Sequence, residues 1–364
     1  MNKKKTSIIL IISFFFVVLC SCENSAIERK KINVQINPNL EFINSILLTS
    51  KYNEITKPYI GYGLMNEESN QYTDTVKDFF GKYQTSTIYN EIEAMIPNGF
   101  TFGRPVELML SLGDSKDFSM QYPLSELCIQ YSGGVEKITS LLNQLNDFSK
   151  ETKYFEFFET IKSYYDPYLQ KADNYLQTVP FIPMIEDFYG KEQNSYNFIF
   201  SVLMVGHFGI QFFDKKNMSA DLFSVFCPDN RDNIEEIFSA GIIFHEFSHP
   251  FINPLTEKYN HVAEKYSDAY ERLKRYKLPD YKSGYGDWQE CINEHFVRAS
   301  AIYLLSKCER KEDAKRFLEN DLYCGYKYIP AILELYNHYD NNRKKYKTFD
   351  EFYPTLLKVF ENEI

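Results

Sequence analysis

The sequence has few features of a disulfide scaffold, a nucleic-acid binder or an integral membrane protein. It contains seven cysteines in 364 residues and no Cys-x-x-Cys pair, which argues against a disulfide framework and against cysteine-ligated zinc. Basic residues (40) are fewer than acidic ones (50), and the net charge of −10 argues against nucleic acid as a partner. Beyond the N-terminus, no apolar run is long enough to span a bilayer.

Histidine is also scarce, with six residues in the chain, and two of them form a short motif. Residues 245–249 read His-Glu-Phe-Ser-His. Four helical residues turn by about 400°, so His245 and His249 would project from one face, where two imidazoles can occupy two corners of a Zn²⁺ tetrahedron. Glu246 would then lie beside the metal and act as a general base on water. The alternative is a structural pair of buried histidines.

The residues around this motif favour a helix. Asp232 followed by Glu235 is a capping-box pattern with Asp232 as the N-cap, and apolar residues then recur at helical spacing as far as Ile242. Pro250 follows the motif directly, so we expect the helix to end or kink at about His249. The predicted metal site therefore lies near a helix end.

The N-terminus is typical of a targeting segment. Three lysines precede an apolar stretch, residues 7–19, that is too short for a comfortable membrane span. The following Leu-Cys-Ser-Cys resembles a bacterial lipoprotein signal, and the resemblance implies cleavage before Cys22 and acylation there, because a small residue precedes it. The alternative is an ordinary secretory signal. We expect a lipid-anchored protein of the bacterial cell envelope, on the outer membrane.

The predicted organisation has three parts. Residues 1–21 form the signal peptide, residues 22–31 a polar tether, and residues 32–364 one catalytic unit with room for two lobes that meet near residues 230–250. Strands are predicted at residues 32–36, 196–205, 208–213 and 222–227. Later helices are predicted at residues 254–276, 286–307, 311–320, 327–340 and 348–362. The fold class is therefore α+β, with a small mixed sheet in the first half and a mainly helical second half.

The strand at residues 222–227 leads toward the histidine helix. It is a candidate edge for binding an extended peptide by strand addition. Its alternative role is ordinary sheet core.

A third zinc ligand must come from outside the histidine motif. The metzincin pattern needs a glycine and a histidine where Ile252 and Leu255 stand. Residues 288–295, Trp-Gln-Glu-Cys-Ile-Asn-Glu-His, resemble the second ligand helix of gluzincin metallopeptidases, whose third ligand is a glutamate that often follows asparagine. The resemblance implies a zincin-like fold with Glu294 as the third ligand and Glu246 as the general base. Glu290, on the same helix face, is the alternative ligand.

The mature chain also resembles a group of bacterial lipoproteins that carry a domain of unknown function with predicted peptidase character. Members have a similar His-Glu-Phe-Ser-His helix and a later Asn-Glu with an arginine four residues on, here Arg298. Glu294 and Arg298 fall on one helix face, so Arg298 is a candidate to hold the Glu294 carboxylate in place. The alternative is a surface ladder of ion pairs.

Peptidases of this kind usually donate a hydrogen bond from a tyrosine or histidine to the tetrahedral oxyanion. Tyr336, His338 and Tyr339 on a late helix are the candidates, and His207 and Tyr285 are further ones. The sequence thus predicts a lipid-anchored metallopeptidase with Zn²⁺ as cofactor and a peptide or protein as substrate. Two alternatives are a non-catalytic binding or assembly lipoprotein with a structural metal site, and a zinc hydrolase of a non-peptide substrate.

Overall fold

The computed structural model describes residues 30–227, 239–276 and 287–362. Residues Lys31–Ile364 make one compact unit that combines a small sheet with many helices, so the predicted α+β class is confirmed. Within the described ranges, no helix has both the length and the apolar character needed to cross a membrane. The predicted signal peptide, Cys22, the Asp232–Glu235 capping pair and Tyr285 all lie outside the described residues.

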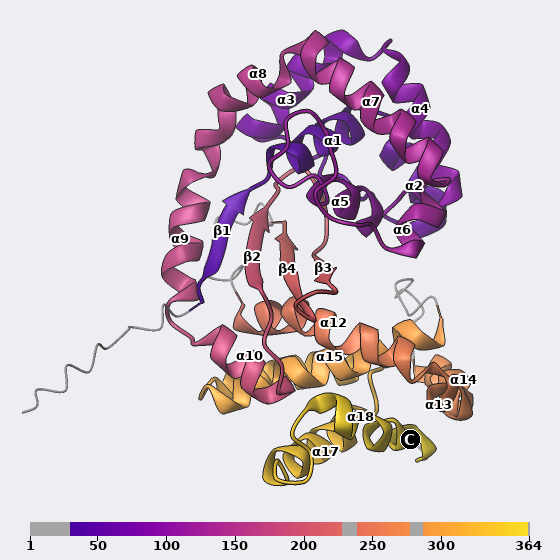
Figure 1. The fold of residues 1–364 in the computed structure, drawn as a ribbon, viewed down its shortest axis with the longest axis vertical. Coiled ribbons are helices and arrows are strands. Elements are labelled where there is room, and N and C mark those ends of the chain that lie inside the picture. The colour runs from indigo at the N-terminus through magenta and orange to yellow at the C-terminus, as the bar shows by residue number, and fades with distance from the viewer. Residues whose placement is uncertain (1–29, 228–238, 277–286, 363–364) are drawn as a thin grey trace, which may run out of the picture. The chain divides into compact units, whose positions relative to one another are not determined.

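In the part of the chain that the structure describes, the sheet has four strands in the order β1-β2-β4-β3 (Figure 1). They are β1 (Ile32–Ile36), β2 (Ser195–Phe200), β3 (Phe208–Asp214) and β4 (Ser219–Phe226). Strands β1, β2 and β4 are parallel, whereas β3 runs antiparallel to β4. Parallel strands covered on both faces read as continuous apolar runs, and β2 and β4 are buried at most positions. The four strands correspond to those predicted, although β2 ends at Phe200, five residues early.

The strand order corrects the expectation about the peptide-binding edge. Strand β4 lies between β2 and β3, so the segment at residues 222–227 offers no open edge. Leu222 and Val225 are fully buried, as in ordinary sheet core. The edge strand next to β4 is β3.

A run of helices separates β1 from β2, including the segment at residues 60–135, where the sequence pattern is mixed. Helix α1 is buried around most of its circumference and lies at the centre of this group. The helices are α1 (Pro38–Thr49), α2 (Tyr52–Ile60), α3 (Gln71–Phe80), α4 (Thr87–Met95), α5 (Gly103–Leu110), α6 (Glu126–Tyr131), α7 (Val135–Thr152), α8 (Tyr154–Ile161), α9 (Asp166–Leu176) and α10 (Phe181–Tyr189).

The described residues after the sheet are mainly helical, as predicted. Helix α12 lies at one end of the sheet and packs along α15, with α17 and α18 beyond them (Figure 1). The helices are α12 (Ala240–Lys258), α13 (Asn260–Ala263), α14 (Asp268–Leu273), α15 (Trp288–Lys307), α16 (Lys311–Tyr323), α17 (Ile329–Asn341) and α18 (Phe349–Leu356). The α12–α15 pair brings together the two segments that carry the predicted ligands.

Helix α12 begins later than its sequence suggests. Its N-cap is Ser239, whose hydroxyl accepts a hydrogen bond of 3.2 Å from the backbone N–H of Gly241. The assignment of Asp232 as the N-cap of this helix is therefore wrong. A serine two residues before a glycine is a weaker sequence signal for an N-cap than a capping-box pattern.

Helix α12 also continues past Pro250 to Lys258, so of the two outcomes expected at about His249, an end or a kink, the end is wrong. Proline lacks the N–H that would bond to the carbonyl oxygen of Glu246, a loss that costs about 3 kcal/mol inside a helix. Burial of the second half of the helix offsets this cost. Its buried side chains include Phe251, Ile252 and Thr256.

Candidate metal centre

The two motif histidines lie on one face of α12, as their spacing predicts. Their Nε2 atoms are 3.1 Å apart, and the rings are nearly perpendicular, at 78°. The Nδ1 atom of His249 is 3.2 Å from the Oδ1 atom of Asn253, one turn further along the helix. With the proton on Nδ1, His249 donates to Asn253 and keeps the Nε2 lone pair for a metal. Asn253 was not identified from sequence, although its i+4 spacing from His249 was a readable signal.

Glu294 reaches the histidines from α15. Asp287 caps this helix by accepting a hydrogen bond of 2.8 Å from the backbone N–H of Glu290. The Oε1 atom of Glu294 then lies 3.5 Å from Nε2 of His249. Glu290 is exposed and is not part of the group.

We call His245, His249 and Glu294 the metal triad. Their three candidate ligand atoms all lie within 4.8 Å of one another. In a tetrahedral zinc site with ligand bonds of about 2.0–2.1 Å, ligand atoms are roughly 3.3 Å apart. Two imidazole nitrogens and one carboxylate oxygen at these separations therefore fit Zn²⁺ in both donor type and spacing.

The protonation states of the triad side chains favour the binding of a metal cation. Burial lowers the pKa of His245 well below its usual value, so its imidazole is neutral at pH 7. Burial alone would raise the pKa of Glu294, but the positive charge of the Arg298 guanidinium outweighs it and brings the pKa to about 2. The triad therefore presents a neutral imidazole and an ionised carboxylate without prior loss of a proton at neutral pH.

Arg298 holds the Glu294 carboxylate, as the helix spacing predicts. Its guanidinium donates to Oε2 of Glu294 at 3.0 Å and to Oδ1 of Asp321 at 2.8 Å. The ring of Tyr326 lies beneath it, with the guanidinium carbon 4.2 Å from the ring centroid. Local sequence pattern does not indicate Asp321 or Tyr326, because both reach Arg298 only through the way the chain after α15 folds back on that helix.

Helix α15 is also held against α12 by Asn293, the residue before Glu294. The side-chain oxygen of Asn293 accepts a hydrogen bond from the hydroxyl of Thr256, and the Tyr353 hydroxyl bonds to the same threonine. The Asn-Glu pair thus has two roles: the asparagine fixes the helix contact, and the glutamate faces the histidines.

Glu246 lies beside the triad but outside it. Its Oε1 atom is 4.0 Å from Nε2 of His245, and its side chain is 9% exposed. Burial, together with repulsion from the Glu294 carboxylate, raises its pKa to about 8. This carboxyl group therefore exchanges a proton near neutral pH, which is the property required of a general base and acid.

A cavity of about 230 Å³ opens next to the triad. Its lining residues are His207, Ile242, His245, Glu246, Arg298, Ala301, Phe317 and Asp321. His207 directly precedes β3 and stacks on the ring of Phe226, with centroids 4.4 Å apart. Burial lowers its pKa to about 4, so its imidazole is neutral and can donate one hydrogen bond.

The three tyrosine and histidine candidates on α17 do not line this cavity. The Tyr336 hydroxyl donates to the backbone oxygen of Phe296 at 2.9 Å, inside the packing between α15 and α17. Tyr339 is fully buried, and His338 is exposed. Among the oxyanion candidates within the described residues, His207 is the one that the fold brings to the triad.

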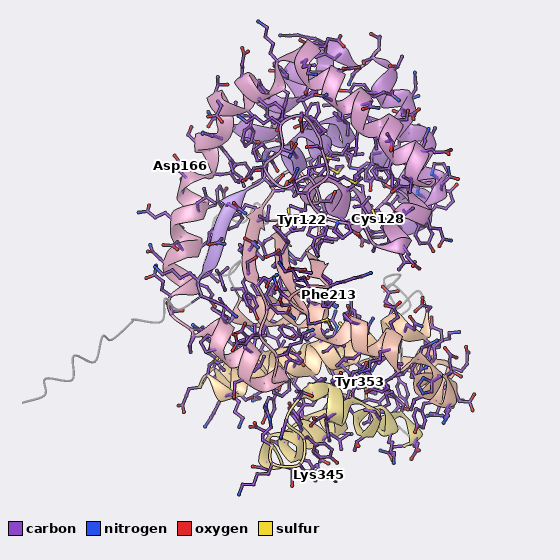
Figure 2. The ribbon with its side chains drawn as sticks, in the orientation of Figure 1. Tyr122, Cys128, Asp166, Phe213, Lys345 and Tyr353 are labelled. Carbon is purple, nitrogen blue, oxygen red and sulfur yellow. The ribbon has the colours of Figure 1, made fainter. Side chains whose placement is uncertain are left out.

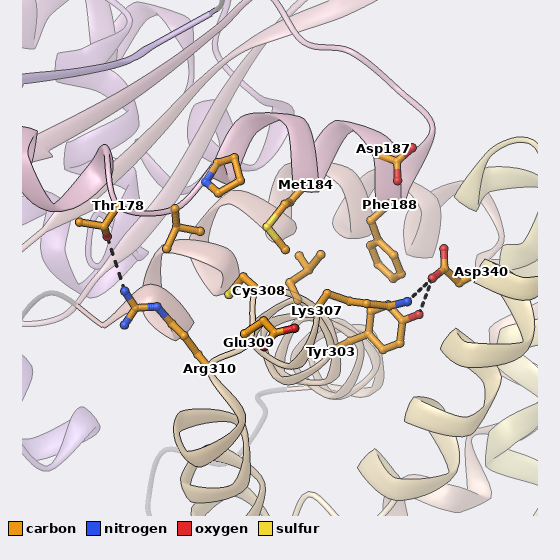
Figure 3. A pocket seen from close by; sticks show the side chains of 13 residues that line it. Thr178, Met184, Asp187, Phe188, Tyr303, Lys307, Cys308, Glu309, Arg310 and Asp340 are labelled. Carbon is orange, nitrogen blue, oxygen red and sulfur yellow. Dashed lines mark hydrogen bonds and ion pairs between the residues drawn. The ribbon is translucent and has the colours of Figure 1, made fainter.

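A different cavity, of about 730 Å³, lies at the C-terminal end of α15 (Figure 3). Asp340 accepts hydrogen bonds there from Lys307, at 2.7 Å, and from the Tyr303 hydroxyl, at 2.8 Å. Arg310 reaches the Thr178 hydroxyl. These polar groups satisfy one another, and none of them belongs to the metal triad, so the chemistry is expected at the smaller cavity.

The fold and the triad define an α+β protein with a candidate metal centre between two packed helices. The chain belongs to the family described as domain of unknown function DUF4932, whose model matches residues 32–359. Neither the comparison with curated proteins nor the comparison with solved structures gives a match. The family is thus established, while the resemblance to gluzincins stays a prediction.

Proposed function

We propose that this protein is a zinc-dependent metallopeptidase. The observation that carries the proposal is the convergence of His245, His249 and Glu294, with the Glu246 carboxyl beside them but outside the group. A purely structural metal site gains nothing from an additional buried carboxyl group, which costs free energy to desolvate. Glu246 therefore favours a catalytic over a structural centre.

The proposed reaction is the addition of water to a peptide carbonyl. A Zn²⁺ ion in such a site supplies a Lewis acid that acidifies water and polarises a carbonyl oxygen. Glu246 takes the proton from water as the new C–O bond forms, and returns it to the leaving amine as the C–N bond breaks. His207 is proposed to donate a hydrogen bond to the carbonyl oxygen as negative charge develops there.

Strand β3 supports a peptide as the substrate. It is an edge strand, and an edge presents backbone N–H and C=O groups that pair with an extended chain. Gly209 in this strand lies against α12: a Cβ atom placed there would be 2.9 Å from the carbonyl oxygen of Glu246 and 3.4 Å from Cβ of His249. The absence of a side chain at Gly209 allows the strand backbone to approach the catalytic helix closely.

The direct test is metal-dependent turnover. We expect the detergent-solubilised full-length protein to contain about one Zn²⁺ per chain and to cleave members of a peptide mixture, detected by mass spectrometry. Removal of zinc by a chelator should abolish cleavage, and addition of zinc should restore it. A fully zinc-loaded protein that cleaves no peptide would contradict the proposal and favour a binding lipoprotein. Cleavage of esters or glycosides alone would favour a non-peptide hydrolase.

We also propose that the protein is anchored to the outer membrane by lipid on Cys22. Cys22→Ala is then expected to abolish labelling by a radioactive fatty acid, because the acceptor thiol is lost. Cys20→Ala is the matched control and should be labelled and processed normally. Label retained in the first variant and lost in the second would reverse the assignment.

A further inference from the structure

The side chains of β3 that face α12 lead from the metal triad to a third cavity. Gly209, Gln211 and Phe213 share one face of the strand, because alternate residues point the same way. Gly209 lies against His249, whereas Gln211 and Phe213 line a cavity of about 520 Å³. Phe213 lies near the C-terminal end of β3 (Figure 2). The opposite face is occupied, since Phe212 stacks on Tyr122 with centroids 4.6 Å apart.

We call this cavity the β3–α12 pocket. Helix α12 contributes the turns that directly follow the triad, and α10 and α18 supply two more rings. The apolar lining includes Tyr189, Phe213, Met218, Phe251, Leu255 and Phe349. Two of these are unusually exposed for large apolar side chains, Phe213 at 39% and Met218 at 66%. Apolar groups exposed at the mouth of a cavity are typical of a binding site rather than of a solvated surface.

Three charged residues also line the pocket, Lys191, Glu257 and Asp350, and Glu257 is exposed. Asp350 is neutralised by Lys258 at 2.7 Å. The Lys191 ammonium lies 5.6 Å from the centroid of the Phe213 ring, and burial lowers its pKa. An apolar side chain therefore matches the interior better than a charged one does.

The spacing between the triad and the pocket fits an extended chain. Strand residues rise by about 3.3 Å, so Gln211 and Phe213 are roughly 7 and 13 Å along β3 from Gly209. A peptide paired to the edge of β3, with its scissile bond at the triad, would pass the pocket two to four residues from that bond. Its side chain at that position would point toward α12.

We propose that the β3–α12 pocket is a specificity subsite that binds a bulky apolar side chain of an extended peptide, two to four residues from the bond at the metal triad. This proposal rests on the proposed peptidase function and names its substrate class. We assign a peptide segment to the β3–α12 pocket because both β3 and α12 connect the pocket to the candidate metal centre.

The test separates binding from hydrolysis. The probes are fluorescein-labelled, end-blocked peptides of about ten residues that carry one phenylalanine, moved position by position through an alanine and serine background. Their binding is measured by anisotropy to zinc-loaded Glu246→Gln, and their cleavage sites are measured with the wild type. We expect cleavage two to four residues from the phenylalanine and tight binding only of peptides that contain it.

A pocket-filling variant provides the decisive comparison. Leu255 is half-buried and lines the pocket. Leu255→Trp should therefore lower kcat/KM for the phenylalanine peptides roughly 100-fold. It should leave kcat/KM unchanged for the background peptide that contains no phenylalanine. Leu335→Trp alters a half-buried leucine of α17 outside the pocket and is the matched control.

The outcomes distinguish the two proposals. Cleavage without preference for phenylalanine would overturn the subsite and leave the peptidase function intact. The same conclusion would follow if Leu255→Trp lowered kcat/KM equally for peptides with and without phenylalanine. Phenylalanine-dependent binding that Leu255→Trp removes, without cleavage by the wild type, would support the subsite and contradict hydrolysis. The absence of both binding and cleavage would overturn both.

Discussion

Replacing Glu246 with glutamine is expected to lower kcat on any cleaved peptide by roughly 10³-fold, while the zinc content stays at one ion per chain. Glutamine keeps the size of the side chain and has no carboxylate to accept a proton from water. Glu246 is outside the metal triad, so its loss removes no ligand. The measurement is a pair of values on one preparation: kcat from peptide hydrolysis and zinc from elemental analysis.

Glu290→Gln is the matched control, because it makes the same chemical change at an exposed residue outside the triad. It should retain both activity and metal. If Glu246→Gln kept the activity of the wild type, the proposed role of this carboxyl group would be wrong. If it lost zinc as well, Glu246 would be a ligand rather than a base.

The second large effect is expected from the triad itself. Loss of a residue that only supports a metal ligand weakens binding roughly 10–100-fold. We expect a larger loss of zinc affinity from each of the variants His245→Ala, His249→Ala and Glu294→Ala. Each change removes one of three protein donors, and two donors cannot complete a tetrahedral site without extra water. Competition with a chromophoric chelator measures the affinity without requiring catalysis.

Arg298→Lys and Glu290→Ala are informative comparisons in the same titration. Lysine keeps the positive charge beside Glu294 but lacks the planar guanidinium that joins Glu294 to Asp321. Arg298→Lys should therefore weaken zinc binding by only roughly 10–100-fold. Glu290→Ala should leave the affinity unchanged. Full zinc occupancy in all three triad variants would show that the metal binds elsewhere.

The sequence was sufficient for the parts of the site that depend on local spacing. His245, His249 and Glu246 are fixed by one helical turn, and Arg298 reaches Glu294 because they are one turn apart. Glu294 itself required the packing of α15 on α12, which no local pattern encodes. The resemblance to a known ligand helix supplied that link.

The features that were missed depend on contacts between distant segments. The edge position of β3 follows from the order of four strands, three of which lie far from β1 in sequence. Pro250 usually marks a helix end, but tertiary burial of the following turns keeps α12 intact. Asp321 reaches Arg298 only because α16 folds back on α15. The sequence names His207 as one of several candidates to stabilise the oxyanion. It does not rank His207 above the others, because no neighbouring residue indicates that His207 stacks on Phe226 or lines the cavity.

The pairing of β1 with β2 has a consequence for how the chain acquires its fold. Ile32 lies opposite Tyr196, so the first strand to be synthesised finds its partner only after ten helices have followed it. Contacts so remote in sequence carry a large loop-closure entropy and slow the search for the native topology. The intervening helices make mostly local contacts and can form earlier. We expect β1 to dock late, and until it does, the edge of β2 is open to association with other chains.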